Sequence, residues 1–186
     1  AERSIASHSA ALTLLSAALL AAASPQFEHA RKLYNLTDFR GAVGLLEPVR
    51  DKTAEEWELM GRSYYMMGDY KNATEHLEKA VGAAISSDRM LWLGRAYGRR
   101  AETSSMITAP RYASRARQAF EKAVELDPGN LEAINDLFEY YLEAPGFLGG
   151  GYDKARNLAA RIAVLDPVEG HYALASDCYC HFTSPI

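Results

Sequence analysis

The sequence predicts an all-α fold, a right-handed superhelical solenoid of antiparallel helix pairs with about four repeats and a terminal helix. Two observations support this class. Apolar residues recur every three or four positions through most of the chain, which is the spacing of amphipathic helices and not of strands. The chain also repeats itself: Gly61 and Tyr64 recur, at the same separation, as Gly94 and Tyr97.

The first element is a separate segment at residues 1–24, ahead of a repeat domain at residues 25–186. Residues 10–23 carry no charge and are too few to cross a bilayer as a helix. Arg3 precedes them, and Ala21 and Ala23 form a small-residue cleavage pattern, as in a secretory signal. The alternative is a retained apolar helix packed on the end of the fold. A signal predicts an extracytoplasmic protein, periplasmic or secreted; a retained helix predicts a cytoplasmic one.

Small residues at recurring positions define the helix pairs of the repeat domain. We expect Gly61 and Gly94, on first helices, to let the two helices of a pair approach closely. Alanines recur on the second helices, and tyrosines on the first helices are expected to fill the gaps to the next unit. Residues 101–110 are interpreted as an insertion within the third pair, and Asp-Pro dipeptides end second helices. The recurring residues are Ala73, Ala116 and Ala155, and Tyr64, Tyr97 and Tyr141.

This pattern resembles the tetratricopeptide repeat (TPR) family, whose period is about 34 residues. The resemblance implies a non-catalytic scaffold or adaptor, without a cofactor, that binds a protein or peptide in a concave groove lined by the first helices. The final residues depart from the family's polar capping helix, so this end is a candidate for self-association or for continuation into a longer array. The matching residues are Trp57, Gly61, Tyr64, Gly68, Tyr70, Ala73, Ala80, Leu93, Gly94, Tyr97, Ala116, Phe120, Ala123 and Pro128.

The stretch EAPGFLGGGYDKA, residues 143–155, joins the helices of the fourth pair and resembles a loop of some bacterial TPR proteins. Phe138 occupies the position of Gly61 and Gly94, so we expect it to push the paired helix away and to require a longer connection. Phe147 and Leu148 are expected to anchor that loop. The alternative is anion binding by the backbone of Gly149, Gly150 and Gly151, although no Lys-Ser/Thr pair follows the glycines.

The candidate groove carries basic, aromatic and acidic side chains in turn. Its arginines would hold a carboxylate, and its aromatic residues would give apolar contact. In the alternative, the basic and acidic stripes face each other and pair. A different class of function, small-ligand or anion binding, would use the arginines or the glycine loop. The candidate residues are Arg62, Tyr65, Trp92, Arg95, Arg99, Asn135, Asp136 and Glu139.

Other classes of function find less support. The formal net charge of −4 argues against a nucleic-acid binder, and neither a zinc-protease nor a serine-hydrolase motif occurs. Cys178, Cys180 and His181, with His171, form either a metal site of unusual spacing or a pair of packed thiols. Arginines surround residues 101–110, which are either a polar loop or a site for an anionic partner or surface.

Overall fold

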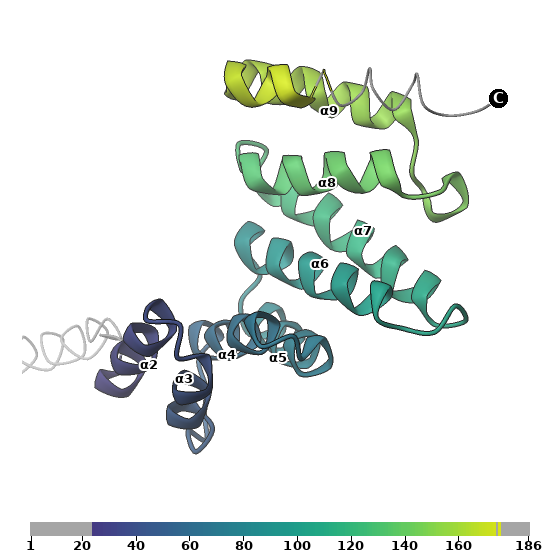
Figure 1. Cartoon of the computed structure of the whole chain (residues 1–186). Coiled ribbons are helices and arrows are strands. Elements are labelled where there is room, and N and C mark those ends of the chain that lie inside the picture. Colours follow the sequence, from purple (N-terminus) through teal and green to yellow (C-terminus); the bar gives the residue numbers. More distant parts are fainter. Residues whose placement is uncertain (1–23, 174, 176–186) are drawn as a thin grey trace, which may run out of the picture.

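The computed structural model describes residues 24–173 and 175. Consecutive helices form antiparallel hairpins that stack in chain order, from α2–α3 at one end to α8–α9 at the other (Figure 1). The predicted all-α stack of four helix pairs is confirmed, and residues 167–173 are helical where the terminal helix is predicted. The elements are α2 (Pro25–Asn35), α3 (Phe39–Leu46), α4 (Ala54–Met66), α5 (Tyr70–Ala83), α6 (Ser87–Glu102), α7 (Ala109–Leu126), α8 (Leu131–Glu143), the 3-10 helix η1 (Gly146–Leu148) and α9 (Tyr152–Leu165).

A polar side chain fixes the start of each first helix. The oxygen atoms of Ser24, Thr53, Ser86 and Asn130 each accept a hydrogen bond from a backbone amide in the first turn of α2, α4, α6 and α8. The Glu56 carboxylate in turn accepts a hydrogen bond from the Thr53 amide, which completes a capping box. Because such caps satisfy amides that have no partner within the helix, they set where each repeat begins.

The turns inside the first two pairs have the same construction. Asp38 and Asp69 cap α3 and α5 with nearly identical backbone angles. Each follows a residue with positive φ, Thr37 at 63° and Gly68 at 78°. The shared turn shows that the first pair, whose sequence follows the repeat pattern less closely, is a copy of the second.

The insertion at residues 101–110 lies between α6 and α7, as predicted: residues 103–108 form the connection, and the two residues at each end extend the flanking helices. α6 and α7 have 16 and 18 residues, against 13 and 14 in α4 and α5. The third pair therefore projects beyond the second at this end.

Close approach within a pair depends on a glycine facing a large side chain. A Cβ atom added to Gly61 would lie 2.6 Å from Cγ of Leu77, and one added to Gly94 would lie 2.5 Å from the ring of Phe120. The predicted close contact is confirmed. The atoms that fill the space belong to Leu77 and Phe120, whereas the buried alanines of the second helices lie beside this contact.

In the fourth pair the large residue is on the first helix and the small one is on the second. Phe138 is buried in the core, and the repeat register places Ala159 of α9 where Leu77 and Phe120 stand. α8 and α9 pack less extensively than α4–α5 or α6–α7, as the bulk of Phe138 predicts. The small residue has thus moved to the second helix in this pair, which also has the longer, glycine-rich connection.

The glycine-rich connection is a self-contained turn. Gly149 has φ of 90°, and a Cβ atom on Gly150 would lie 1.8 Å from the Ala144 carbonyl oxygen. The amides of Gly149, Gly150 and Gly151 donate to the carbonyls of Gly146, Pro145 and Tyr141. The expectation that Phe147 anchors the loop is wrong: its side chain is 82% exposed. Tyr140 anchors it instead, by donating a hydrogen bond to the Leu148 carbonyl at 3.0 Å.

Tyr97 and Tyr141 of the first helices bond to the preceding pair, not to the next one as the sequence suggested, whereas Tyr64 packs against the core on both sides. The Tyr97 hydroxyl donates to Glu78 of α5, and the Tyr141 hydroxyl donates to Glu121 of α7 at 2.8 Å. Burial, followed by the hydrogen bond to Glu78, raises the pKa of Tyr97 to about 12. Each hydroxyl therefore remains a donor to its glutamate at neutral pH.

We predict that Gly94→Ala destabilises the protein, because its methyl group overlaps the Phe120 ring. Overpacking of this kind costs about 1–3 kcal/mol, which exceeds the gain of roughly 0.5–1 kcal/mol from replacing a helical glycine. Gly98→Ala in the same helix is the matched control. It meets nothing within 4 Å, so it should raise the free energy of unfolding in urea. Equal effects of the two variants would contradict the close-contact explanation.

We predict that Gly150→Ala destabilises the protein by about 1–3 kcal/mol, because the rigid Ala144 carbonyl must move to accommodate the methyl group. Gly146→Ala, in the same connection, meets nothing within 4 Å and should have little effect. Chemical denaturation of both variants measures the difference. A stable Gly150→Ala protein would show that the turn does not require glycine there.

Candidate partner-binding groove

Three hollows lie in a row along the first helices of the four pairs. Their volumes are about 220, 390 and 310 Å³, and α2, α4, α6 and α8 contribute most of their linings. Arg62 borders both the first and the second hollow, and Tyr65 and Arg95 border the third. The first helices therefore form the predicted groove, and α2 extends it through Phe27, Tyr34 and Asn35, which the degenerate first repeat concealed from sequence reasoning.

Trp92 is the centre of a cation–aromatic stack in this groove. The guanidinium carbons of Arg62 and Arg95 lie 4.4 and 5.2 Å from its ring centroid, and Tyr65 meets it edge to face at 5.6 Å. Arg62 also lies 5.5 Å from the ring centroid of Tyr34. Stacking of this type restricts the side chains, so the groove presents a preorganised surface across three helix pairs.

Arg62 retains hydrogen-bonding capacity in the described part of the chain. Its Nη1 pairs with Glu58 at 3.4 Å, while its Nε is buried and has no hydrogen-bond partner among the described residues. An unsatisfied donor at a buried position is costly. Because Nε itself is shielded, a carbonyl or carboxylate oxygen in either neighbouring hollow would satisfy it only after a movement of the partly exposed Arg62 side chain.

Arg95 is already neutralised. Its Nε and Nη2 donate to the two oxygens of Asp136 at 2.5 and 3.1 Å, and its Nη2 lies 3.2 Å from Glu132. Burial lowers the pKa of Arg95, but the hydrogen bonds and charges of Asp136 and Glu132 outweigh burial and raise it overall. For this residue the basic and acidic stripes pair with each other, as the alternative interpretation proposed, and the pair joins α6 to α8.

Arg99 and Arg89 are also engaged. Arg99 pairs with Glu102 and donates to the Tyr70 hydroxyl at 3.3 Å. Arg89, which was not among the predicted groove residues, lies 2.7 Å from Glu55 and 3.0 Å from Glu58 and so joins α6 to α4. Most of the cations along the groove therefore hold neighbouring helix pairs together.

The acidic end of the groove is not neutralised to the same degree. Glu139 and Glu143 border the third hollow, and neither forms an ion pair with a described residue. Burial, then the charges of Asp136 and Glu143, raise the pKa of Glu139 in spite of nearby Arg95. Asn135 lies on α8, half-buried, and lines none of the three hollows. The structure thus brings together all the predicted groove residues except Asn135.

The predicted metal site and the predicted N-terminal signal concern residues that lie mostly outside the described part of the chain. Within the residues that the structure describes, no cluster of metal-ligating side chains is found, and no helix is long and apolar enough to span a membrane. Cys178, Cys180 and His181 lie outside the described residues, as do residues 1–23. The metal and signal interpretations therefore stay predictions.

Comparison with solved structures finds the same fold. YrrB, described as a TPR protein with an unusual peptide-binding site, is 20% identical with a TM-score of 0.64, covering 94% of this chain and 86% of its own. TTC0263, a thermophilic TPR protein of Thermus thermophilus, is 19% identical with a TM-score of 0.62, covering 82% of this chain and 79% of its own. The MamA protein is 18% identical with a TM-score of 0.62, covering 79% of this chain and 74% of its own.

Comparison with curated proteins yields no match. A family model does match: the model named Tetratricopeptide Repeats-Sensor aligns with residues 38–140, which is more than half of the chain. The matched region begins at the cap of α3 and ends in α8, so it contains the hairpins with the glycine contacts and most of the groove. The chain belongs to the Tetratricopeptide Repeats-Sensor family of TPR proteins.

Proposed function

We propose that this protein is a non-catalytic scaffold that binds an extended segment of a protein partner in the groove formed by α2, α4, α6 and α8. Its TPR architecture supports the general role, since helical solenoids of this kind present concave surfaces to partners. The description of YrrB as having a peptide-binding site supports a peptide ligand by analogy of fold.

The observation that carries the proposal is the environment of Arg62. A buried donor without a partner among the described residues stands against the face of Trp92, between two hollows. Backbone carbonyls of an extended peptide are suitable acceptors, and a side chain next to that carbonyl would contact Trp92 and Tyr65. Aromatic and arginine anchors of this type dominate many peptide interfaces.

The charge distribution favours one orientation of the peptide. An acidic or carbonyl group would bind near Arg62, and a basic side chain would bind near Glu139 and Glu143, whose carboxylates have no cationic partner in the described part of the chain. The Arg95–Asp136 pair lies between these ends and presents little net charge. Paired charges here would fix register more than they add affinity.

The geometry gives less support to the small-anion alternative. The amides of Gly149, Gly150 and Gly151 are already bonded to carbonyls, so they are not available to an anion. Arg95 and Arg99 are paired with carboxylates. An anion in the groove would have to displace these partners.

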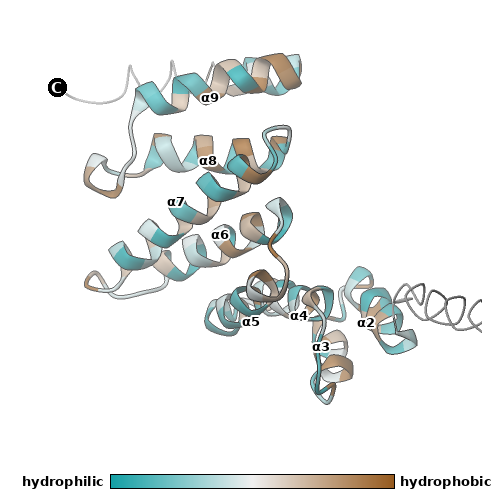
Figure 2. Ribbon diagram, turned by 180° about the vertical axis from the view of Figure 1, so that it is seen from behind, coloured by the Kyte–Doolittle hydropathy of each residue, from teal (hydrophilic) through white to brown (hydrophobic). Residues whose placement is uncertain are grey.

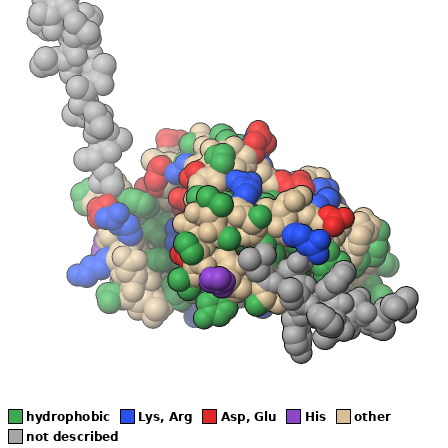
Figure 3. All heavy atoms as spheres, turned by 90° about the horizontal axis from the view of Figure 1, so that it is seen from above, with side chains coloured by type: hydrophobic (Ala, Val, Ile, Leu, Met, Phe, Trp, Pro, Cys, Tyr) green, Lys and Arg blue, Asp and Glu red, His purple; other side chains and the backbone are tan. Residues whose placement is uncertain are grey.

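Self-association through the carboxyl-terminal end remains a separate proposal. Val164 and Val168, at the end of α9 and just beyond it, are exposed. Figure 3, which looks onto this end, shows apolar side chains mixed with scattered acidic and basic ones. The extracytoplasmic location also stays a prediction, because it depends on residues 1–23.

We predict that Trp92→Ala weakens peptide binding on the order of tenfold or more. Peptides selected from a displayed random library would be measured by fluorescence anisotropy against the wild type, Arg62→Ala and Trp92→Ala. Arg40→Ala is the matched control for Arg62→Ala, because Arg40 is exposed on α3, a second helix. Selected peptides that bind all four proteins equally, with circular dichroism unchanged, would place the site outside the groove.

We predict that Glu139→Gln stabilises the protein at pH 7, because the raised pKa of Glu139 means that its ionised form disfavours the folded state. Its favourable contribution is present below the ordinary carboxyl pKa and is lost as pH rises through the raised value. The stability difference should therefore vanish below about pH 4. Thermal melts across this range measure it, with exposed Glu75→Gln as control. A difference that persists in acid would contradict the electrostatic explanation.

A further inference from the structure

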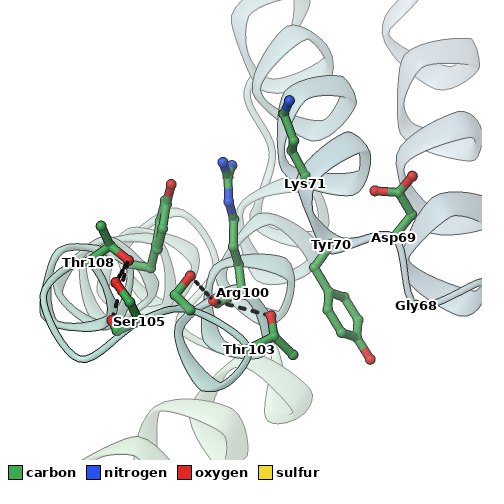
Figure 4. A pocket seen from close by; sticks show the side chains of 10 residues that line it. Gly68, Asp69, Tyr70, Lys71, Arg100, Thr103, Ser105 and Thr108 are labelled. Atoms are coloured by element: carbon green, nitrogen blue, oxygen red, sulfur yellow. Dashed lines mark hydrogen bonds between the residues drawn. The ribbon is translucent and has the colours of Figure 1, made fainter.

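A fourth hollow, of about 410 Å³, lies outside the groove, on the edge formed by the turns within the helix pairs (Figure 4). It is bounded by the α4–α5 turn on one side and by the α6–α7 connection on the other. Polar groups dominate its lining, and most are hydroxyls or cations. The lining residues that carry the argument are Lys71, Arg100, Thr103, Ser104, Ser105 and Thr108.

The hollow has cations that no carboxylate of the described residues neutralises. Within that part of the chain, Lys71 has no ion pair, and Arg100 bonds only to an uncharged group, donating to the Thr74 hydroxyl at 2.6 Å. The guanidinium carbon of Arg100 lies 4.4 Å from the ring centroid of Tyr112, which fixes the side chain. Figure 4 shows Lys71 and Arg100 extending to the same side of the hollow.

The carboxylate in the lining, that of Asp69, is already engaged in hydrogen bonds within its own helix. It caps α5 by accepting hydrogen bonds from the backbone amide of Asn72 at 3.1 Å and from its side-chain amide at 2.6 Å. Arg111, at the start of α7, is exposed and has no ion pair among the described residues, although it does not line the hollow. The site is therefore locally basic, although the chain as a whole is acidic.

An exposed apolar tip lies beside these cations. Met106 and Ile107 are 93% and 91% exposed, and they stand between the serines and the threonine that line the hollow. Met66 and Met67, directly before Gly68 of the lining, are exposed as well. Figure 2 shows hydrophobic residues at the tips of both the α6–α7 connection and the η1 connection, which lie on the same side of the stack.

We propose that this edge docks onto an anionic membrane surface, with a lipid headgroup phosphate in the hollow and Met106 and Ile107 inserted among the acyl chains. Lys71, Arg100 and the hydroxyls would bind the phosphate. Basic residues near anionic lipids and apolar side chains in the interfacial region reinforce each other. A soluble phosphate would use the hollow but would leave the apolar tip without a role, so the lipid is the better occupant. This site is independent of the groove.

The test is flotation of the full chain with vesicles of phosphatidylcholine alone or with about a third phosphatidylglycerol. We expect binding to the anionic vesicles only, decreasing with salt. Met106→Ser/Ile107→Ser and Lys71→Glu should each weaken it on the order of tenfold. Their matched controls are Val164→Ser, an exposed apolar residue of α9, and Lys32→Glu, an exposed lysine of α2. Neither control should alter binding.

Several outcomes would overturn the proposal. No flotation with anionic vesicles at low salt would do so, as would equal loss in a control and its matched variant. Binding that Lys71→Glu abolishes but that Met106→Ser/Ile107→Ser leaves intact would assign the hollow to a soluble anion, which competition by inorganic phosphate would then reveal. The tested side chains are exposed, so thermal melts should show folding unchanged.

Discussion

The stack depends on a size match within the second, third and fourth helix pairs, where a small side chain faces a large one. Gly61 against Leu77 and Gly94 against Phe120 let two helices approach until the ring or branched side chain fills the gap. In the fourth pair the large residue, Phe138, is on the first helix, and Ala159 stands in the register position opposite. Close packing of this kind tolerates neither overlap nor cavity.

A second set of interactions joins one pair to the next. The Tyr97 and Tyr141 hydroxyls donate to glutamates of the preceding second helices, and Arg89 and Arg95 form ion pairs between successive first helices. In a repeat protein each unit contacts mainly its neighbours, so such contacts set the curvature of the whole stack. These ion pairs also neutralise much of the charge along the concave face. What remains there for a partner, among the described residues, is the Trp92 surface, the free donor of Arg62 and the unpaired acidic end.

The two proposed surfaces lie on different parts of the hairpins. The groove uses the inner faces of the first helices, whereas the basic hollow uses the turns that connect first to second helices. The insertion at residues 101–110 lengthens α6 and α7 and carries Met106 and Ile107 outward from the second pair. A membrane bound at this edge would leave the groove open, so the two surfaces can act together without sharing a residue that carries either argument.

The helical periodicity, the pairing of helices and the positions of close contact could be predicted from the residues alone, because these features are local or repeat at fixed spacing. The sequence also identified Arg62, Tyr65, Trp92 and Arg95 as neighbours, since equivalent positions of successive first helices must share one face. Which cations remain free depends on the packing of the helices. Arg95 and Asp136 are far apart in the chain, and their pairing follows from how α6 and α8 stack. The packing also decides that Phe147 faces solvent and that Lys71 and Arg100 border one hollow, because loop direction and contacts between repeats depend on the packed positions of helices and not on any local pattern.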